Sequence, residues 1–121
     1  MQILSVTPML RTPDVKTTVA FYTETLGFIC DGFNDEWTWA SLRRDQTVVM
    51  ISAMNEHDGD ETPIFTGSLY FLTDDVDKVW EELRTRARIC YPIENFDCGM
   101  REFAIYDNNG YLLQFGQPVK K

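Results

Sequence analysis

Two short stretches, Thr12-Pro13-Asp14-Val15 and Thr73-Asp74-Asp75-Val76, predict where the helices of this chain begin and thereby decide its fold. In each stretch an aspartate suited to an N-cap directly precedes the first apolar position of a helical pattern. The second stretch follows the first at an offset of 61 residues. The same offset aligns two further pairs, Thr7 with Ser68 and Leu10 with Phe71. We interpret this agreement as an internal duplication.

The first half of the chain predicts one strand, one helix and three further strands. Apolar residues recur at helical spacing from Val15 to Leu26, and Gly27 follows where a helix often ends in a left-handed residue. Arg44-Asp45-Gln46 is suited to a hairpin turn between the last two strands. The expected strands cover residues 2–11, 28–33, 37–43 and 47–54.

The second half repeats this order after a polar, acidic connector at residues 55–65. An amphipathic helix is expected from Val76 to Leu83, and Asp107-Asn108-Asn109-Gly110 predicts a tight hairpin turn. The expected strands lie near residues 66–73, 88–91, 100–106 and 111–116. The sequence thus predicts an α+β fold, a single domain over 1–121, in which βαβββ modules at about 1–54 and 66–118 form a cup-shaped, curved mixed sheet.

The composition excludes several classes of partner. The 121 residues are 44% hydrophobic and carry a net charge of −8 with a pI near 4.5. Nucleic acids and anionic membrane surfaces both need a basic face, whereas a cationic ligand would be attracted. Three cysteines without regular spacing favour reduced thiols, and no signal peptide or membrane-spanning run is evident. We therefore expect a soluble, cytoplasmic protein.

The chain resembles the vicinal oxygen chelate superfamily, which comprises glyoxalases, bleomycin-resistance proteins and dioxygenases. The resemblance rests on the helix opening at Thr12 to Val15, on Leu26-Gly27-Phe28, and on Phe103 to Gly110, where Asn108 replaces the proline of a usual DPxG turn. It spans the chain from about Val6 to Phe115. The resemblance implies two βαβββ modules around a ligand site.

A narrower resemblance links the chain to bleomycin-binding resistance proteins. It is carried by four short segments: Pro8-Met9-Leu10, Trp39 to Arg43, Ile51-Ser52-Ala53 and Gly99 to Ala104. This resemblance implies a homodimer that sequesters a cationic antibiotic and performs no chemistry. Within these segments, packing alone explains Arg101 and Glu102 least well.

The residues at the superfamily's metal positions do not suit a metal ion. The resemblance maps those positions onto Thr7, Met50, Ser68 and Gln114. Hydroxyls are poor ligands, a thioether suits copper(I), and one amide oxygen cannot hold an ion that needs three or four ligands. The single histidine, His57, lies in the acidic connector, whose charges we interpret as solvated. We therefore expect no metal and no cofactor.

Strand alternation predicts which side chains face the cup. If Ala40 and Leu42 point toward a helix, then Trp37, Trp39 and Ser41 point the other way. The indoles could instead be core residues or dimer contacts. A wall of indoles, phenols, a thioether, an acid and an amide suits a planar or cationic ligand through stacking and cation–π contacts. The predicted ligand-binding residues are Phe33, Trp37, Trp39, Met50, Ser68, Tyr70, Glu102 and Gln114.

Three functions remain open at the level of sequence. The first is a metal-free protein that sequesters a planar or cationic small molecule, such as a bleomycin-type antibiotic. The second is a metal-independent isomerase or lyase that uses Glu102 with Tyr70 or Tyr106 for acid–base chemistry. The third is a domain whose cup is filled by its own side chains and that serves only in association. The missing metal ligands and the aromatic wall favour the first.

Overall fold

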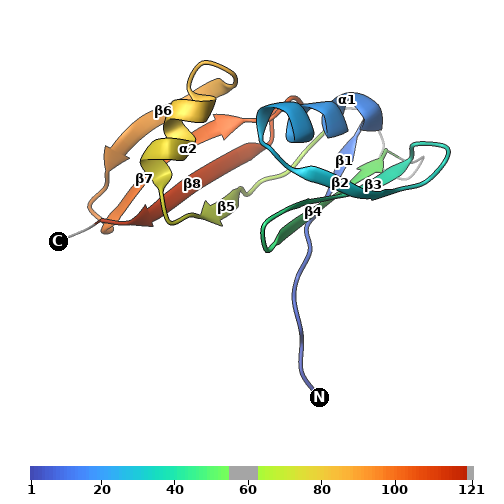
Figure 1. Cartoon of the computed structure of the whole chain (residues 1–121), viewed down its shortest axis with the longest axis horizontal. Helices are drawn as coiled ribbons and strands as arrows, with labels where there is room; N and C mark the ends of the chain where they lie inside the picture. The colour runs from blue at the N-terminus through green and yellow to red at the C-terminus, as the bar shows by residue number, and fades with distance from the viewer. Residues whose placement is uncertain (55–62, 120–121) are drawn as a thin grey trace. The chain divides into compact units, whose positions relative to one another are not determined.

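A computed structural model describes residues 1–54 and 63–119. The chain divides between Pro63 and Ile64 into two compact units, which we call unit 1 and unit 2. Each unit consists of a four-stranded sheet and a helical segment in the order βαβββ, as Figure 1 shows. The predicted α+β fold with two modules and mixed sheets is therefore confirmed.

Unit 1 contains a sheet with the strand order β1-β4-β3-β2. Strand β1 runs parallel to β4, and the other two pairings are antiparallel. A bulge interrupts the pairing of β2 with β3 between Cys30 and Gly32. The elements are β1 (Met9–Thr12), α1 (Val15–Ala20), the π-helical turn η1 (Phe21–Thr25), β2 (Ile29–Phe33), β3 (Trp39–Arg44) and β4 (Thr47–Ala53).

Unit 2 repeats this topology with the strand order β5-β8-β7-β6. Here β5 runs parallel to β8, and the pairs β7–β8 and β6–β7 are antiparallel. Two irregularities interrupt the pairing of β6 with β7, between Ile89 and Tyr91 and between Tyr91 and Glu94. The elements are β5 (Leu69–Leu72), α2 (Val76–Leu83), β6 (Arg88–Asn95), β7 (Met100–Tyr106) and β8 (Leu112–Pro118).

The two helices begin with the same set of hydrogen bonds. The carboxylate of Asp14 accepts from the backbone N–H of Thr17, and Asp75 accepts in the same way from Lys78. The hydroxyl of Thr12 accepts from the N–H of Asp14, and Thr73 does so for Asp75. Such bonds satisfy donors that a helix start otherwise leaves unpaired. The duplicated motif therefore encodes a duplicated cap.

Each sheet buries one face beneath its helix. In unit 1 the buried face carries Leu10, Ala40, Leu42, Val49 and Ile51, which are at most 4% exposed. In unit 2 the corresponding face packs against α2, which lies across β7 and β8 in Figure 1. Its fully buried members are Phe103, Ile105 and Leu113, with Val76 and Leu83 from the helix. We call the face of each sheet that lies opposite its helix the open face.

The largest boundary errors concern strands, and among them β6 extends to Asn95 rather than ending at Tyr91. The first strand covers only Met9–Thr12 rather than 2–11, because residues 1–8 form no strand and most of them are exposed. The first helical segment does end at Leu26 as predicted, although Phe21–Thr25 is π-helical, and Gly27 follows in the predicted left-handed conformation with a φ of 75°. The strand expected at 66–73 is limited to Leu69–Leu72, the length that pairs with β8. Most of the predicted connector, 55–62, lies outside the described residues.

Candidate functional site

The open face of unit 1 presents Trp39 and Met50, as the alternation of the strands predicted. In the ladder Trp39 lies opposite Ser52, and Ser41 lies opposite Met50. These positions alternate with Ala40 and Leu42, which are fully buried on the helix side. Trp39 also lies against Gly32, where an added Cβ would be 3.4 Å from the indole. The indole of Trp39 therefore lies over Gly32 of β2.

Trp37 does not share this face, contrary to the predicted parity, and neither does Phe33, which was predicted to bind ligand. The bulge in β2 places Phe33 opposite Ala40, which is buried on the helix side. The rings of Phe33 and Trp37 stack with centroids 4.4 Å apart, and the ammonium group of Lys16 in α1 lies 5.7 Å from the centre of the Trp37 indole. The two aromatic residues thus form a separate stacked pair.

The loop between β2 and β3 explains this error. Trp37 precedes β3 and has a φ of 57°, which is rare for a bulky side chain. The side-chain oxygen of Asn34 accepts from the backbone N–H groups of Thr38 and Trp39, at 2.8 and 3.2 Å. These bonds close a tight turn in the backbone, and Trp37 is one of the residues of that turn. Strand alternation therefore does not extend to Trp37.

Unit 2 brings its four predicted residues into one cluster. Tyr70, Gln114 and Ala104 lie side by side across β5, β8 and β7, and Glu102 lies one pleat further along β7. The hydroxyl of Ser68 donates to the side-chain oxygen of Gln114 at 2.6 Å. The phenol of Tyr70 donates to Glu102 at 3.0 Å. Ser68, Tyr70, Glu102 and Gln114 therefore belong to one hydrogen-bonded network.

Tyr91 completes the network, although the sequence analysis missed it. Its phenol donates to the second oxygen of Glu102 and accepts from the side-chain NH2 of Gln114 at 2.9 Å. The expected short strand stopped at Tyr91, and β6 is irregular on both sides of it, so alternation gave no reliable direction for this residue. One signal in the sequence could have found it: Tyr91 was expected on a strand close to that of Glu102, an acid that packing alone did not explain.

Burial controls the chemistry of this network. Glu102 is 8% exposed, and it accepts hydrogen bonds from the two phenols and from Gln114. Burial, followed by the hydrogen bond to Glu102, raises the pKa of Tyr70 to about 12, and the same causes raise the pKa of Tyr91 to about 12. Both phenols are therefore protonated donors at neutral pH. The cluster therefore presents an oriented carboxyl group with two phenol donors, and neither phenol is a base at neutral pH.

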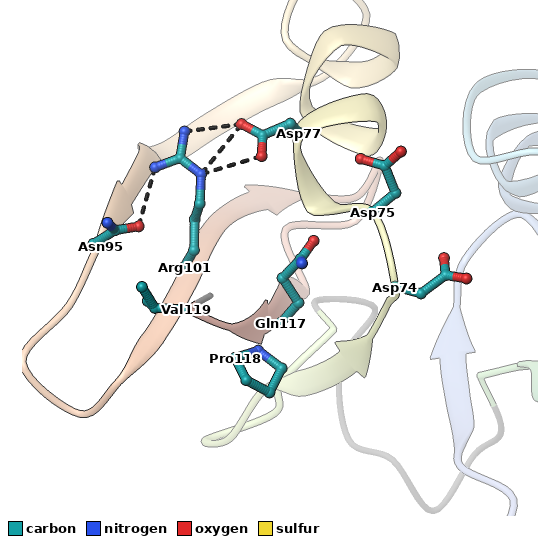
Figure 2. Close-up of a pocket in the computed structure, with 8 residues that line it drawn as sticks. All are labelled: Asp74, Asp75, Asp77, Asn95, Arg101, Gln117, Pro118 and Val119. Carbon is teal, nitrogen blue, oxygen red and sulfur yellow. Dashed lines mark hydrogen bonds and ion pairs between the residues drawn. The ribbon is translucent and has the colours of Figure 1, made fainter. Parts of the chain in front are cut away.

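A surface pocket of about 360 Å³ lies elsewhere on unit 2, beside the start of α2 (Figure 2). Figure 2 shows the guanidinium of Arg101 held between Asp77, at 2.8 Å, and Asn95, at 3.1 Å. Gln117 accepts from the N–H of Val76, and Asp75 caps the helix. These polar groups stabilise the helix start and its packing on β7. The pocket contains none of the predicted ligand-binding residues.

A family comparison agrees with this fold. A family model for the glyoxalase/bleomycin resistance protein/dioxygenase superfamily matches residues 3–115. The chain belongs to this superfamily. A search of curated proteins found no significant match.

Several solved structures share the fold over nearly their full length. The bleomycin-binding protein of Streptomyces verticillus, solved with copper(II)-bleomycin, is 27% identical over 99% of both chains, with a TM-score of 0.73. The bleomycin resistance determinant encoded on transposon Tn5 is 24% identical over 98% of this chain and 100% of the other, with a TM-score of 0.77. A protein of unknown function from Agrobacterium tumefaciens is 21% identical over 98% and 97%, with a TM-score of 0.76.

The residues at the superfamily's metal positions in unit 2 do not fit a metal ion. Ser68 and Gln114 direct their polar groups to each other, to Tyr91 and to Glu102. Across the described residues, no three His, Cys, Asp or Glu side chains gather as a metal site would require. The donor set is arranged for hydrogen bonding.

No helix in the described parts of the chain has the length and apolarity to cross a bilayer.

Replacing Glu102 by glutamine should lower the pKa of both network tyrosines. The partial desolvation of the two phenols persists in the variant, in which Tyr70 is still 43% exposed, but the hydrogen bonds and charge of Glu102 that also raise their pKa values are changed. Between pH 10 and 12 the variant should therefore show more phenolate absorbance than the wild type. Because a raised phenol pKa stabilises the fold below pH 10 and that stability is lost as pH rises through 12, wild-type unfolding should also become easier across this range.

The assignment of these titrations is checked with Tyr70→Phe and Tyr91→Phe, each of which should remove one late-titrating phenol. Identical alkaline titrations of the wild type and Glu102→Gln would show that Glu102 does not control the two tyrosines.

Gly116 is predicted to be required for the position of Tyr70. A Cβ at Gly116 would lie 2.0 Å from the Tyr70 hydroxyl oxygen, so Gly116→Ala must displace the phenol from Glu102. We expect a loss of about 1–3 kcal/mol in the free energy of unfolding, measured by urea denaturation. In a Tyr70→Phe background, which lacks the hydroxyl, the penalty should be smaller. Equal penalties in both backgrounds would contradict this role.

Proposed function

We propose that this superfamily member is a metal-free binding protein that sequesters a planar or cationic small molecule. The observation that carries the proposal is the network around Glu102 in unit 2. It includes positions that the resemblance maps onto metal ligands of the superfamily's enzymes, and it offers a buried carboxylate that accepts hydrogen bonds from two phenols and an amide, all neutral groups. A carboxylate of this kind attracts a cationic group, and the charge of −8 strengthens that attraction.

Two further observations support binding of a planar compound. Trp39 lies on the open face of unit 1, where its indole can stack on a ring. Among the relatives, the Streptomyces verticillus protein binds bleomycin, and the Tn5 protein is a bleomycin resistance determinant. A bleomycin-type antibiotic is therefore the first compound to test, and the cytoplasm is the compartment in which such a protein would intercept it.

Thermal-shift screening tests the proposal most broadly. A ligand that binds only the native state must raise the melting temperature. We expect bleomycin-type or intercalating cations to raise it in protein treated with a chelator. A screen in which neither class changes the melting temperature would reject the proposal.

A metal-independent isomerase or lyase is the second candidate, because Glu102 is a buried carboxylate flanked by two phenols. The two functions differ in what happens to the compound. A binding protein leaves the compound identified in the screen unchanged, whereas an enzyme converts it to a product. Mass spectrometry of the recovered compound distinguishes the two outcomes. The raised phenol pKa values favour binding, since neither tyrosine is suited to act as a base at neutral pH.

We also propose that the protein is a homodimer. Met1, Ile3, Leu4 and Val6 precede β1 and are at least 86% exposed, so an apolar segment is left for a second copy to cover. Light scattering at micromolar concentration should therefore give twice the chain mass of 14.1 kDa. A measured mass equal to the single chain would reject the dimer.

A further inference from the structure

The surface pocket beside the start of α2 is lined by three carboxylates but by a single guanidinium, all from unit 2. Asp74 and Asp75 directly precede the helix, Asp77 lies in its first turn, and Arg101 reaches toward them from β7 (Figure 2). The lining therefore has more negative than positive charge. Its volume of about 360 Å³ lies in the range of small-molecule sites.

The guanidinium of Arg101 compensates only one of the three carboxylates. Its Nε and Nη2 donate to Asp77 at 2.8 to 3.3 Å, and its Nη1 donates to the side-chain oxygen of Asn95 at 3.1 Å. All three nitrogens of the guanidinium are thus engaged (Figure 2). The other two carboxylates of the pocket receive no counter-charge from this arginine.

Asp74 and Asp75 keep acceptor capacity for a ligand. Asp75 uses Oδ1 to accept from the backbone N–H of Lys78 at 3.2 Å, which caps α2 and leaves Oδ2 for another donor. Within the described parts of the chain, the Asp74 carboxylate has no hydrogen-bond or ion-pair partner, and Lys78 forms no ion pair with either aspartate. The pocket therefore contains two carboxylates that lack a cation.

The end of β8 supplies the other part of the lining. Gln117 is fixed there, because its side-chain oxygen accepts from the backbone N–H of Val76 in α2. Pro118 and Val119 follow it and add apolar surface, which we call the apolar wall of the pocket (Figure 2). A ligand that suits both parts of the lining carries a positive group on an apolar stem.

We propose that this pocket binds a primary organic ammonium with a short alkyl stem. Its N–H groups donate to Asp74 and Asp75, and its stem packs on the apolar wall. A bare metal ion suits the pocket less well, because no three His, Cys, Asp or Glu side chains among the described residues gather as a metal site requires. The inference goes beyond the proposed function, since the pocket contains neither Glu102 nor Trp39.

Three matched probes test the inference: butylammonium, butyltrimethylammonium, which keeps the charge but has no N–H donor, and neutral 1-butanol. Each is titrated into the full chain while the backbone amide NMR signals of Asp75, Val76 and Val119 are followed. Since exposed ion pairs are weak, butylammonium should bind with a Kd of about 1 mM. Butyltrimethylammonium should bind about threefold and 1-butanol about tenfold more weakly, and butylammonium binding should weaken as the salt concentration rises.

Asp74→Asn and Asp75→Asn each remove one carboxylate and preserve the helix cap, because asparagine caps a helix as well as aspartate does. Each should weaken butylammonium binding about threefold, and the double variant about tenfold, with little effect on 1-butanol. Asp35→Asn is the matched control, because it removes the same charge from an exposed residue of unit 1 and should leave the affinity unchanged. Melting curves confirm that each variant is folded.

Three results would overturn the inference. The first is equal binding of butylammonium and butyltrimethylammonium, and the second is an effect of Asp35→Asn as large as that of the pocket variants, since binding would then depend on net charge alone. The third is a set of shifted signals that surrounds Glu102 instead of the start of α2. None of these results bears on the proposed function, which is tested with other compounds and other residues.

Discussion

Trp39→Ala is expected to weaken binding of a planar ligand by about 1–3 kcal/mol, which corresponds to roughly a five- to 150-fold increase in Kd. The indole lies on the open face of unit 1, so its loss removes a stacking surface without opening a hole in the core. The melting temperature should therefore change little. Titration of the ligand, followed by tryptophan fluorescence, measures the affinity.

Trp37→Ala is the matched control for this prediction. It also removes an indole, but one that stacks on Phe33 and lies near Lys16, away from the face of Trp39. Its affinity loss should be much smaller than that of Trp39→Ala. Normal binding by Trp39→Ala, or a loss equal to that of Trp37→Ala, would show that the open face of unit 1 is not the stacking surface.

Phe103→Ala should destabilise unit 2 by about 3–5 kcal/mol. The Phe103 side chain is fully buried, and its ring lies 5.3 Å from Phe115 and 5.1 Å from Trp80. Removing it leaves a cavity between β7, β8 and α2, because these rings cannot all close the gap. Urea denaturation followed by tryptophan fluorescence measures the effect through Trp80.

Leu72→Ala provides the control for Phe103→Ala. Leu72 lies on β5 of the same sheet but is 72% exposed, so the substitution should change the free energy of unfolding by no more than about 0.5 kcal/mol. If the Phe103 variant were as stable as the Leu72 variant, the core of unit 2 would not lie between the sheet and α2 as described.

Local signals in the sequence predicted the fold because they have local causes. Asp14 and Asp75 cap their helices within three residues, and the turn at Asp107–Gly110 closes on itself, with Gly110 at a φ of 87°. Such features depend little on the rest of the chain. The extent of β1 could not be predicted in this way, because a strand needs a partner and β4 pairs only with residues 9–12 of the N-terminal segment.

The candidate site was predictable only where strand alternation held. Trp39, Met50, Tyr70 and Gln114 lie in regular ladders, and their faces were predicted correctly. Trp37 lies in a tight turn, so alternation gave the wrong face for it. Phe33 follows a bulge and Tyr91 lies between two irregularities, so alternation gives no reliable face for either residue. That these residues bind a ligand, and that the two units act as a single domain, stay predictions.

The most direct test of the central claim is a calorimetric titration of chelator-treated protein with bleomycin and with the planar cation 9-aminoacridine. We predict saturable binding of at least one compound at micromolar or lower Kd, with no metal added to the protein, and weaker binding as the salt concentration rises. Absence of saturable binding by both compounds, or binding that appears only after the protein is loaded with a divalent metal ion, would contradict the claim.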